Sequence, residues 1–161
     1  MTDAAVVNAS PLILLSAAGL TDLLQLAGNP VFVPQAVVDE VGGHGPTDAA
    51  IASLRQSGWL RIAPPEPTHS IIEQWDLGKG ESSVLTWAYA HSGTVAVLDD
   101  LAARRCADSL GIPTRGTLGL VLIAKQRGLI PEARPIVNRL RQAGMYLSDK
   151  VVDRALGMVG E

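Results

Sequence analysis

Several residue types are scarce in this 161-residue chain, and each scarcity excludes a class of protein. With Cys106 as its single cysteine, the chain can form neither an internal disulfide nor a cysteine-based zinc site. Aromatic residues make up 4% of the chain, too few for an extended base-stacking surface. No apolar run reaches the roughly 20 residues of a membrane-spanning helix, and no basic residue precedes Arg55, so a signal peptide is not expected. These absences predict a cytoplasmic protein with no membrane partner.

What is present predicts a globular protein. Hydrophobic residues make up 47% and charged residues 18%, and the length suits one domain over residues 1–161. The net charge of −3 is unevenly spread, because residues 1–54 carry five acids and no Lys or Arg. Residues 101–161 carry ten Lys or Arg against five acids. This basic third of the chain could bind along a phosphate backbone. The preferred interpretation is that its Lys and Arg lie on ordinary solvent-exposed helix faces.

Short apolar segments alternate with helical patterns along the chain. The expected strands are Ala4–Val7, Val31–Val33, Trp59–Ile62, Val95–Leu98 and Ile112–Thr114. Ser10-Pro11 is typical of a helix N-cap followed by proline at the first helical position. Strands alternating with helices predict an α/β fold, with three layers and a central parallel sheet covered on both faces.

Two adjacent carboxylates, Asp99 and Asp100, stand where the strand Val95–Leu98 ends and a helical pattern begins. Ligands of open parallel sheets bind outside the carboxyl ends of the strands, so acids in this place are candidate site residues. One of the two could instead cap the next helix. Capping needs one carboxylate, so the second requires another explanation.

Two further acids lie on helices that follow strands. Val37, Val38 and Val41 form an apolar stripe, and Glu40 falls nearer its edge than Asp39, so Glu40 is the acid expected to face inward.

Glu81 lies in line with Val84, Leu85 and Ala88 and extends their stripe toward the helix N-terminus. A carboxylate there needs a partner or a metal, or else is a first-turn Glu that the helix dipole stabilises. The preceding Gly78-Lys79-Gly80 is interpreted as a flexible lead-in to the helix.

Asn8, after the first strand, joins these acids at the predicted sheet edge. Oxygen ligands suit Mg²⁺ and Mn²⁺, and like charges gathered together repel one another unless a cation is present. The pattern therefore predicts a site for a divalent cation. Asn8 could equally be a turn residue that bonds its own backbone.

Five segments carry a more specific signal. They are Val6-Val7-Asn8-Ala9-Ser10-Pro11-Leu12, Val38-Asp39-Glu40-Val41, Leu77-Gly78-Lys79-Gly80-Glu81, Leu98-Asp99-Asp100-Leu101-Ala102-Ala103-Arg104, and Gly111-Ile112-Pro113-Thr114-Arg115-Gly116-Thr117-Leu118-Gly119. In this order they resemble a PIN-like domain, of the DUF3368 branch related to VapC-type toxins. The resemblance covers nearly the whole chain and implies a sheet of four or five strands.

The resemblance also implies an activity and a set of site residues. PIN domains are, as a family, metal-dependent ribonucleases with a quartet of acids, which fall by position on Asn8, Glu40, Glu81 and Asp100, with Asp99 adjacent. The implied metal ligands are Glu40, Glu81, Asp99 and Asp100. Ser10 and Thr117 match positions where the family places small hydroxyl or further polar groups, and are assigned to substrate binding. The departure is Asn8, which brings no charge and cannot act as a base near neutral pH.

The leading hypothesis is a Mg²⁺- or Mn²⁺-dependent endoribonuclease, the toxin of a VapBC-like toxin–antitoxin pair. It implies an RNA substrate, a small cognate antitoxin and a homodimer. Arg104, near the fourth acid, would contact phosphate or pair with a neighbouring carboxylate, and the ion pair is the preferred interpretation. The alternatives are an attenuated PIN-like module that binds RNA or protein, because the first acid is Asn8, and a metal-stabilised interaction protein that dimerises through apolar helices.

Overall fold

The computed structural model describes residues 3–43 and 48–161. Its elements, in chain order, are β1 (Ala5–Val7), α1 (Ala9–Ala17), the 3₁₀ helix η1 (Thr21–Leu26), β2 (Val31–Pro34), α2 (Gln35–Gly43), α3 (Asp48–Gln56), β3 (Leu60–Ala63), α4 (Ser70–Glu73), α5 (Lys79–Ala90), β4 (Val95–Val97), α6 (Leu101–Ser109), β5 (Thr114–Arg115), α7 (Thr117–Gln126), α8 (Arg134–Gln142) and α9 (Asp149–Met158).

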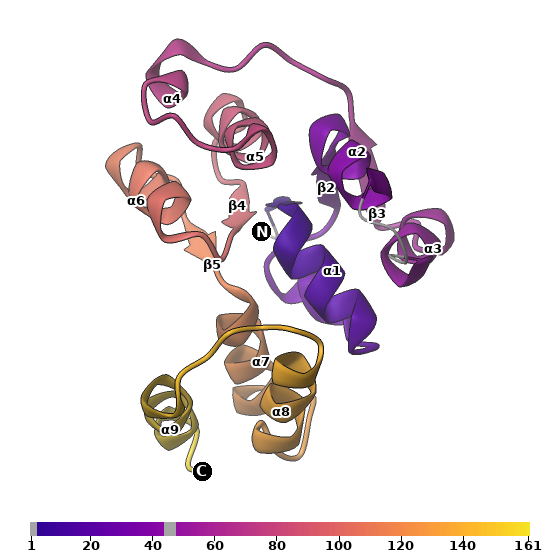
Figure 1. Cartoon of the computed structure of the whole chain (residues 1–161), viewed down its shortest axis with the longest axis vertical. Coiled ribbons are helices and arrows are strands. Elements are labelled where there is room, and N and C mark those ends of the chain that lie inside the picture. Colours follow the sequence, from indigo (N-terminus) through magenta and orange to yellow (C-terminus); the bar gives the residue numbers. More distant parts are fainter. Residues whose placement is uncertain (1–2, 44–47) are drawn as a thin grey trace.

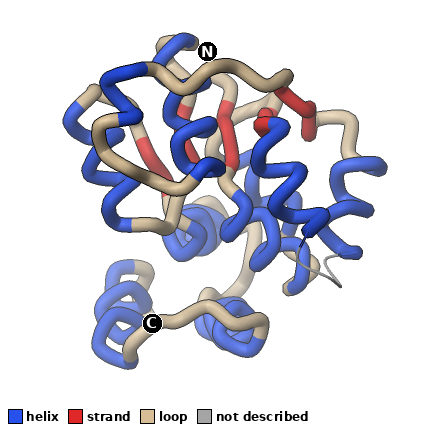
Figure 2. The backbone as a smooth tube through the Cα atoms, turned by 45° about the horizontal axis from the view of Figure 1, so that its top comes forward, coloured by secondary structure: helices blue, strands red, loops and turns tan. Residues whose placement is uncertain are grey.

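The strands form one parallel sheet of five strands in the order β3-β2-β1-β4-β5. The central strand β1 pairs with β2 and β4, and Ala5 lies opposite Val31 and Val95. Helices flank the sheet, with α5 and α6 on the opposite side of the strands from α1 and α7 (Figure 1), and the strands lie enclosed among the helices (Figure 2). The predicted three-layer α/β fold with a parallel sheet is confirmed, and the sheet has five strands.

Some predicted boundaries are wrong at the ends of the elements. The last strand is Thr114–Arg115 and not Ile112–Thr114. Leu60–Ala63 forms the strand predicted at Trp59–Ile62.

The start of the first helix also differs from the prediction. Asn8 and not Ser10 is the N-cap of α1, which begins at Ala9. Pro11 thus lies at the third helical position, where it is tolerated because the first N–H groups of a helix have no partner within the helix. This boundary places Asn8 directly between β1 and α1.

A continuous hydrophobic core joins the sheet to helices from both ends of the chain. Val6, Leu12, Leu85, Leu120 and Leu140 are all fully buried members of it. Burying each such side chain contributes about 1.5–3 kcal/mol. None of the helices in the described ranges is long and apolar enough to cross a membrane.

Candidate active site

The candidate site lies at the carboxyl ends of the central strands. Val7 of β1 lies opposite Val97 of β4, and the Asn8 N–H donates to the Val97 carbonyl over 3.1 Å. Asn8 and the segment that carries Asp99 and Asp100 therefore leave the same edge of the sheet, as the parallel arrangement requires.

Asn8 is almost completely buried, with 4% of its surface exposed. Its side chain makes no capping bond to α1, and Oδ1 is buried without a hydrogen-bond partner among the described residues. A turn residue that bonds its own backbone, one of the two interpretations of Asn8, would not leave Oδ1 in this state. A buried acceptor left unpaired costs about 1–3 kcal/mol, so this oxygen is available to a ligand.

Gly80, the second residue of α5, is the point where Asn8 meets Glu40. A Cβ built at Gly80 would lie 2.9 Å from Asn8 Oδ1 and 3.6 Å from Glu40 Oε2. Any side chain at this position would occupy the space in front of both oxygens. Sequence reasoning missed Gly80 by treating Gly78-Lys79-Gly80 as a lead-in, whereas Lys79 and Gly80 begin the helix. The available signal was a glycine placed directly before Glu81.

Glu40 and Asp39 are both exposed but differ in their contacts. Asp39 accepts a hydrogen bond from Gln35 Nε2 over 2.9 Å and so lies along its own helix, α2. The Glu40 carboxylate lies beside Gly80 and Asn8. Of this pair, Glu40 is the one placed next to the buried amide.

Glu81 is half-buried in the first turn of α5, while Val84, Leu85 and Ala88 of its stripe are buried. Its carboxylate folds back toward the start of the helix, because a Cβ built at Gly78 would lie 2.5 Å from Glu81 Oε2. The positive end of the helix dipole favours a carboxylate there.

Asp99 and Asp100 each serve a helix N-terminus. Asp100 Oδ2 accepts the Ala103 N–H over 2.9 Å and caps α6. Asp99 accepts the Thr117 N–H at Oδ1 over 2.8 Å and the Thr117 hydroxyl at Oδ2 over 2.7 Å, which fixes it at the start of α7. Thr117 is fully buried, so its hydroxyl positions Asp99.

The family model of DUF3368, described as a PIN domain, matches residues 4–161. The chain belongs to this PIN-domain family. A comparison with curated proteins finds no match. PIN domains generally have nuclease activity, usually use divalent metals and act on nucleic acids.

The carboxylates of this PIN domain do not form one tight cluster. In residues 3–43 and 48–161, no group of three or more His, Cys, Asp or Glu is close enough to hold a metal ion. The structure brings Asn8 and Glu40 together at Gly80, whereas Glu81, Asp99 and Asp100 are turned to helix N-termini. Repulsion between like charges favours this separation. The pair of oxygens at Gly80 still fits a hard divalent cation, since Mg²⁺ commonly uses one or two protein carboxylates and keeps several waters.

Arg104 does not form the ion pair that the sequence favoured. The ion pairs in the described part of the chain are Lys125–Glu161 and Arg141–Asp149. A Cβ built at Gly116 would lie 2.8 Å from Arg104 Nη1 and 3.3 Å from Asp99 Oδ1, so the guanidinium lies near Asp99. Thr117 already bonds both Asp99 oxygens, which leaves the exposed Arg104 guanidinium available to another anion.

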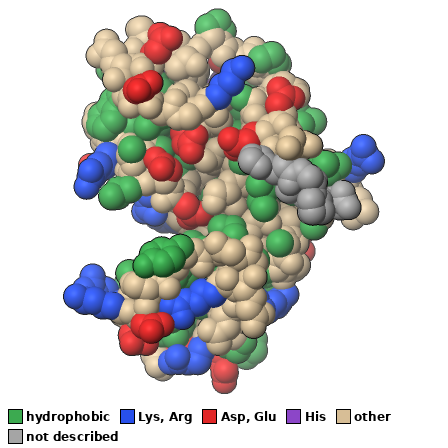
Figure 3. All heavy atoms as spheres, viewed as in Figure 1, with side chains coloured by type: hydrophobic (Ala, Val, Ile, Leu, Met, Phe, Trp, Pro, Cys, Tyr) green, Lys and Arg blue, Asp and Glu red, His purple; other side chains and the backbone are tan. Residues whose placement is uncertain are grey.

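A groove of about 340 Å³ lies between α7 and α9. We call it the arginine groove, because Arg104, Arg115 and Arg154 line it, and none of the three forms an ion pair with another described residue. The space-filling view shows a hollow above the C-terminal helices, with mostly Asp and Glu gathered above it and Lys and Arg together with some acids below it (Figure 3). Ser10, which the family resemblance assigns to substrate binding, is exposed on the first turn of α1.

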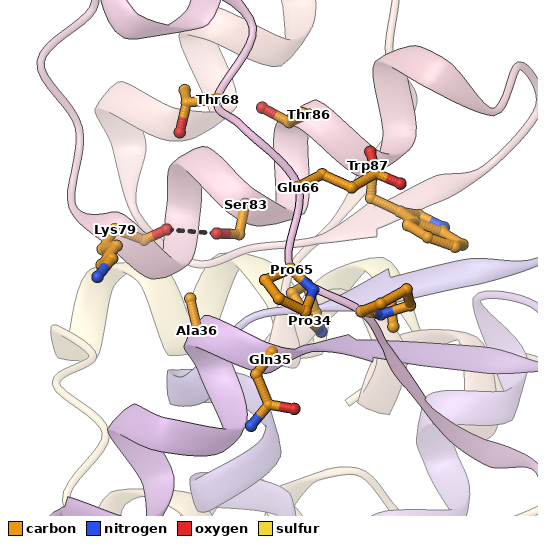
Figure 4. A pocket seen from close by; sticks show the side chains of 12 residues that line it. Pro34, Gln35, Ala36, Pro65, Glu66, Thr68, Lys79, Ser83, Thr86 and Trp87 are labelled. Carbon is orange, nitrogen blue, oxygen red and sulfur yellow. Dashed lines mark hydrogen bonds between the residues drawn. The ribbon is translucent and has the colours of Figure 1, made fainter.

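Two pockets adjoin Lys79. The larger, of about 400 Å³, is lined by Glu40, Lys79 and Gly80 among others. The smaller, of about 110 Å³, is shown in Figure 4. Gln35, Ala36, Pro65 and Lys79 line both pockets, so the two are neighbours.

Proposed function

We propose that this PIN domain is a Mg²⁺- or Mn²⁺-dependent endoribonuclease that hydrolyses RNA phosphodiester bonds. The observation that carries the proposal is the buried and unpaired Asn8 Oδ1, which lies beside Gly80 together with the Glu40 carboxylate. Such an oxygen would be destabilising without a ligand, and it lies at the sheet edge where parallel α/β proteins bind ligands.

Asn8 and Glu40 would hold the cation, with Glu81, Asp99 and Asp100 around it. A bound divalent ion would supply a water of lowered pKa and offset charge on a phosphoryl oxygen. Asn8 offers a neutral oxygen that takes up no proton near neutral pH. Glu40 is therefore the charged group at this position, and the one able to accept a proton from an attacking water. Thr117 holds Asp99 in place and leaves its remaining lone pairs free.

The arginine groove supports a nucleic-acid substrate. Arg104 lies next to Asp99, so phosphates held by Arg104, Arg115 and Arg154 would continue toward the acidic residues. Arginine binds phosphate through a planar fork of donors, and its charge gives binding that weakens as salt rises. We propose a cytoplasmic location, where such an RNA substrate would be met.

We further propose that the protein is the toxin of a VapBC-like pair, with a small cognate antitoxin and a homodimeric state. Exposed apolar side chains that could enter protein contacts include Leu101, Leu129 and Met158, which are 62%, 60% and 69% exposed. Co-expression with the product of a neighbouring short reading frame would test the pairing. Failure of that product to co-purify with the protein or to inhibit its nuclease would contradict it.

Metal titration followed by RNA cleavage tests the nuclease. Calorimetric titration with Mn²⁺ should give saturable binding, and structured RNA should be cleaved in an EDTA-sensitive reaction. Glu40→Gln should weaken both. Glu132→Gln is the matched control, because Glu132 is an exposed glutamate that does not line the pocket beside Glu40. Equal loss in both variants, or the absence of saturable metal binding, would contradict the proposal.

The alternative function is an attenuated PIN-like module that binds RNA or protein without cutting. It is favoured by Asn8 at the position of the first acid and by the engagement of Asp99 and Asp100 at helix N-termini. RNA binding that depends on the arginine groove, without EDTA-sensitive cleavage, would select this function.

A further inference from the structure

The smaller of the two pockets beside Lys79 lies between the end of β2, the loop after β3 and α5. Its volume is about 110 Å³, somewhat below the roughly 150 Å³ of a cavity that admits benzene. One side is open, so the pocket suits a single flat ring system whose outer edge remains in solvent. Figure 4 shows Pro34 and Pro65 facing the side chains of Ser83, Thr86 and Trp87 on α5.

The walls combine apolar faces with a few polar groups. Pro34 and Pro65 offer flat aliphatic rings, while Glu66 and Thr86 contribute oxygens. Thr86 Oγ1 accepts the His69 N–H over 3.2 Å and keeps its own hydroxyl proton available. A few polar groups in a mostly apolar pocket fix the orientation of a ligand.

Trp87 forms part of this wall. Its ring packs on Phe32 and on His91, with ring centroids 4.8 Å and 4.0 Å apart. Its Nε1–H is shielded from solvent and has no acceptor among the described residues. The ring faces are thus engaged by protein neighbours, which hold the ring in place as part of the pocket wall.

The position of the pocket connects it to the proposed reaction. Lys79 lines both this pocket and the one that contains Glu40 and Gly80, and its ammonium forms no ion pair in the described part of the chain. A ligand with a ring in the small pocket would therefore have its attached phosphate close to Lys79 and to the Asn8–Glu40 pair.

We propose that the small pocket binds one nucleobase of the RNA strand, next to the phosphodiester that the Asn8–Glu40 site acts on. Proteins recognise single-stranded RNA by enclosing splayed bases between flat side chains and bonding their edges. A base has apolar faces for the proline walls and polar edge groups for the Thr86 hydroxyl and the Glu66 carboxylate. Lys79 binds the attached phosphate. This inference rests on the proposed ribonuclease function and assigns part of its substrate site.

Nucleotide binding without catalysis tests the assignment. Saturation-transfer NMR of the full chain in EDTA, with each of the four 5′-ribonucleoside monophosphates, should show the base protons in contact with the protein. Ser83→Leu should fill the pocket and weaken binding at least about tenfold, the loss of one or two good contacts. The substitution is compatible with α5, because the Ser83 hydroxyl bonds only the Lys79 carbonyl of its own helix and Leu is the better helix former. Ala90→Leu, at an exposed position of α5, is the matched control and should bind like the wild type.

Two comparisons identify the ligand further. Lys79→Met should weaken binding of the nucleotides and leave the matching nucleosides unchanged. A trinucleotide should bind more tightly than a mononucleotide, whereas equal affinity would mark a free-nucleotide site and overturn the RNA assignment. Absence of base contacts, or equal binding by Ser83→Leu and wild type, would also overturn it.

If the proposed ribonuclease activity is wrong but the nucleobase pocket is right, the experiments give a different result. Nucleotides would then bind in EDTA and depend on Ser83, although no RNA is cut with Mn²⁺. Cleavage by a protein whose nucleotide binding is unaffected by Ser83→Leu would leave the nuclease standing and remove the pocket assignment.

Discussion

Thr117 bonds both carboxylate oxygens of Asp99, over 2.8 Å from its N–H and 2.7 Å from its hydroxyl. The two residues are 18 positions apart, and the bonds join the end of β4 to the start of α7. Asp99, which is adjacent to the position of the fourth family acid, is therefore held rigidly by a buried threonine.

Thr117→Ala should lower the free energy of unfolding by about 1–3 kcal/mol, because Asp99 loses a charge-assisted bond in a partly buried place. Thr117→Ser keeps the hydroxyl and should retain most of that stability. Urea denaturation of the two variants measures the difference. Equal stability of the Ala and Ser variants would show that the hydroxyl bond contributes nothing.

Asn8→Asp should reduce stability without metal and raise metal affinity. The new carboxylate would be buried beside Glu40, where like charges repel. Mn²⁺ should then increase Tm more than in the wild type, since a ligand that binds the folded state stabilises it in proportion to its affinity. Thermal melts with and without Mn²⁺ measure both effects, with the exposed Asn138→Asp as control. An unchanged response to Mn²⁺ would place Asn8 outside the metal site.

Arg154→Ala should weaken single-stranded RNA binding and reduce the slope of log affinity against log salt by about 0.7 for one lost phosphate contact. Arg127→Ala removes an exposed arginine outside the arginine groove and should change neither value. Fluorescence anisotropy at several salt concentrations provides the test. The same slope in both variants would contradict a phosphate contact at Arg154.

We propose that residues 1–161 behave as one domain, because core members come from β1, α1, α7, α8 and α9. Arg139 of α8 also donates to the Ala18 carbonyl at the end of α1. Leu140→Ala should lower the unfolding free energy by about 2–5 kcal/mol and shift a single transition. The exposed Gln142→Ala is the control. Two separate transitions in urea would show that the C-terminal helices unfold independently.

The Glu161 carboxylate should increase the free energy of unfolding at neutral pH, and this contribution should be lost in acid. Its carboxylate accepts the Ala133 N–H, which lowers the pKa of Glu161 the most, with further lowering by the Arg134 N–H and Lys125 and an opposing effect of desolvation. A pKa lowered on folding gives stability that is present above the unfolded value and lost as pH falls through the folded value. Glu161→Gln should therefore melt below the wild type at pH 7, with the difference fading in acid. Glu132→Gln, at an exposed position, is the matched control.

Local sequence pattern was sufficient for the fold class and the family. Buried strands such as Val95–Val97 are short apolar runs, and their alternation with helices leaves a parallel sheet as the arrangement that covers both faces. That pattern also put Asn8, Asp99 and Asp100 at strand ends, and the stripe of α2 favoured Glu40 over Asp39. The places at the strand ends could be predicted because they depend on periodicity within one element, whereas Glu40 is exposed and its role as the site acid stays a prediction.

Tertiary structure decided how those residues are used. The Asp99–Thr117 bonds and the meeting of Asn8 with Glu40 at Gly80 join elements that are distant in sequence. The unpaired Arg104 and the arginine groove likewise follow from how α6, α7 and α9 pack. The sequence by itself determined which oxygens reach the edge of the sheet. Packing between elements decided which of them are bonded to a helix N-terminus and which remain available, because a hydrogen bond depends on ångström-scale distances that no local periodicity sets.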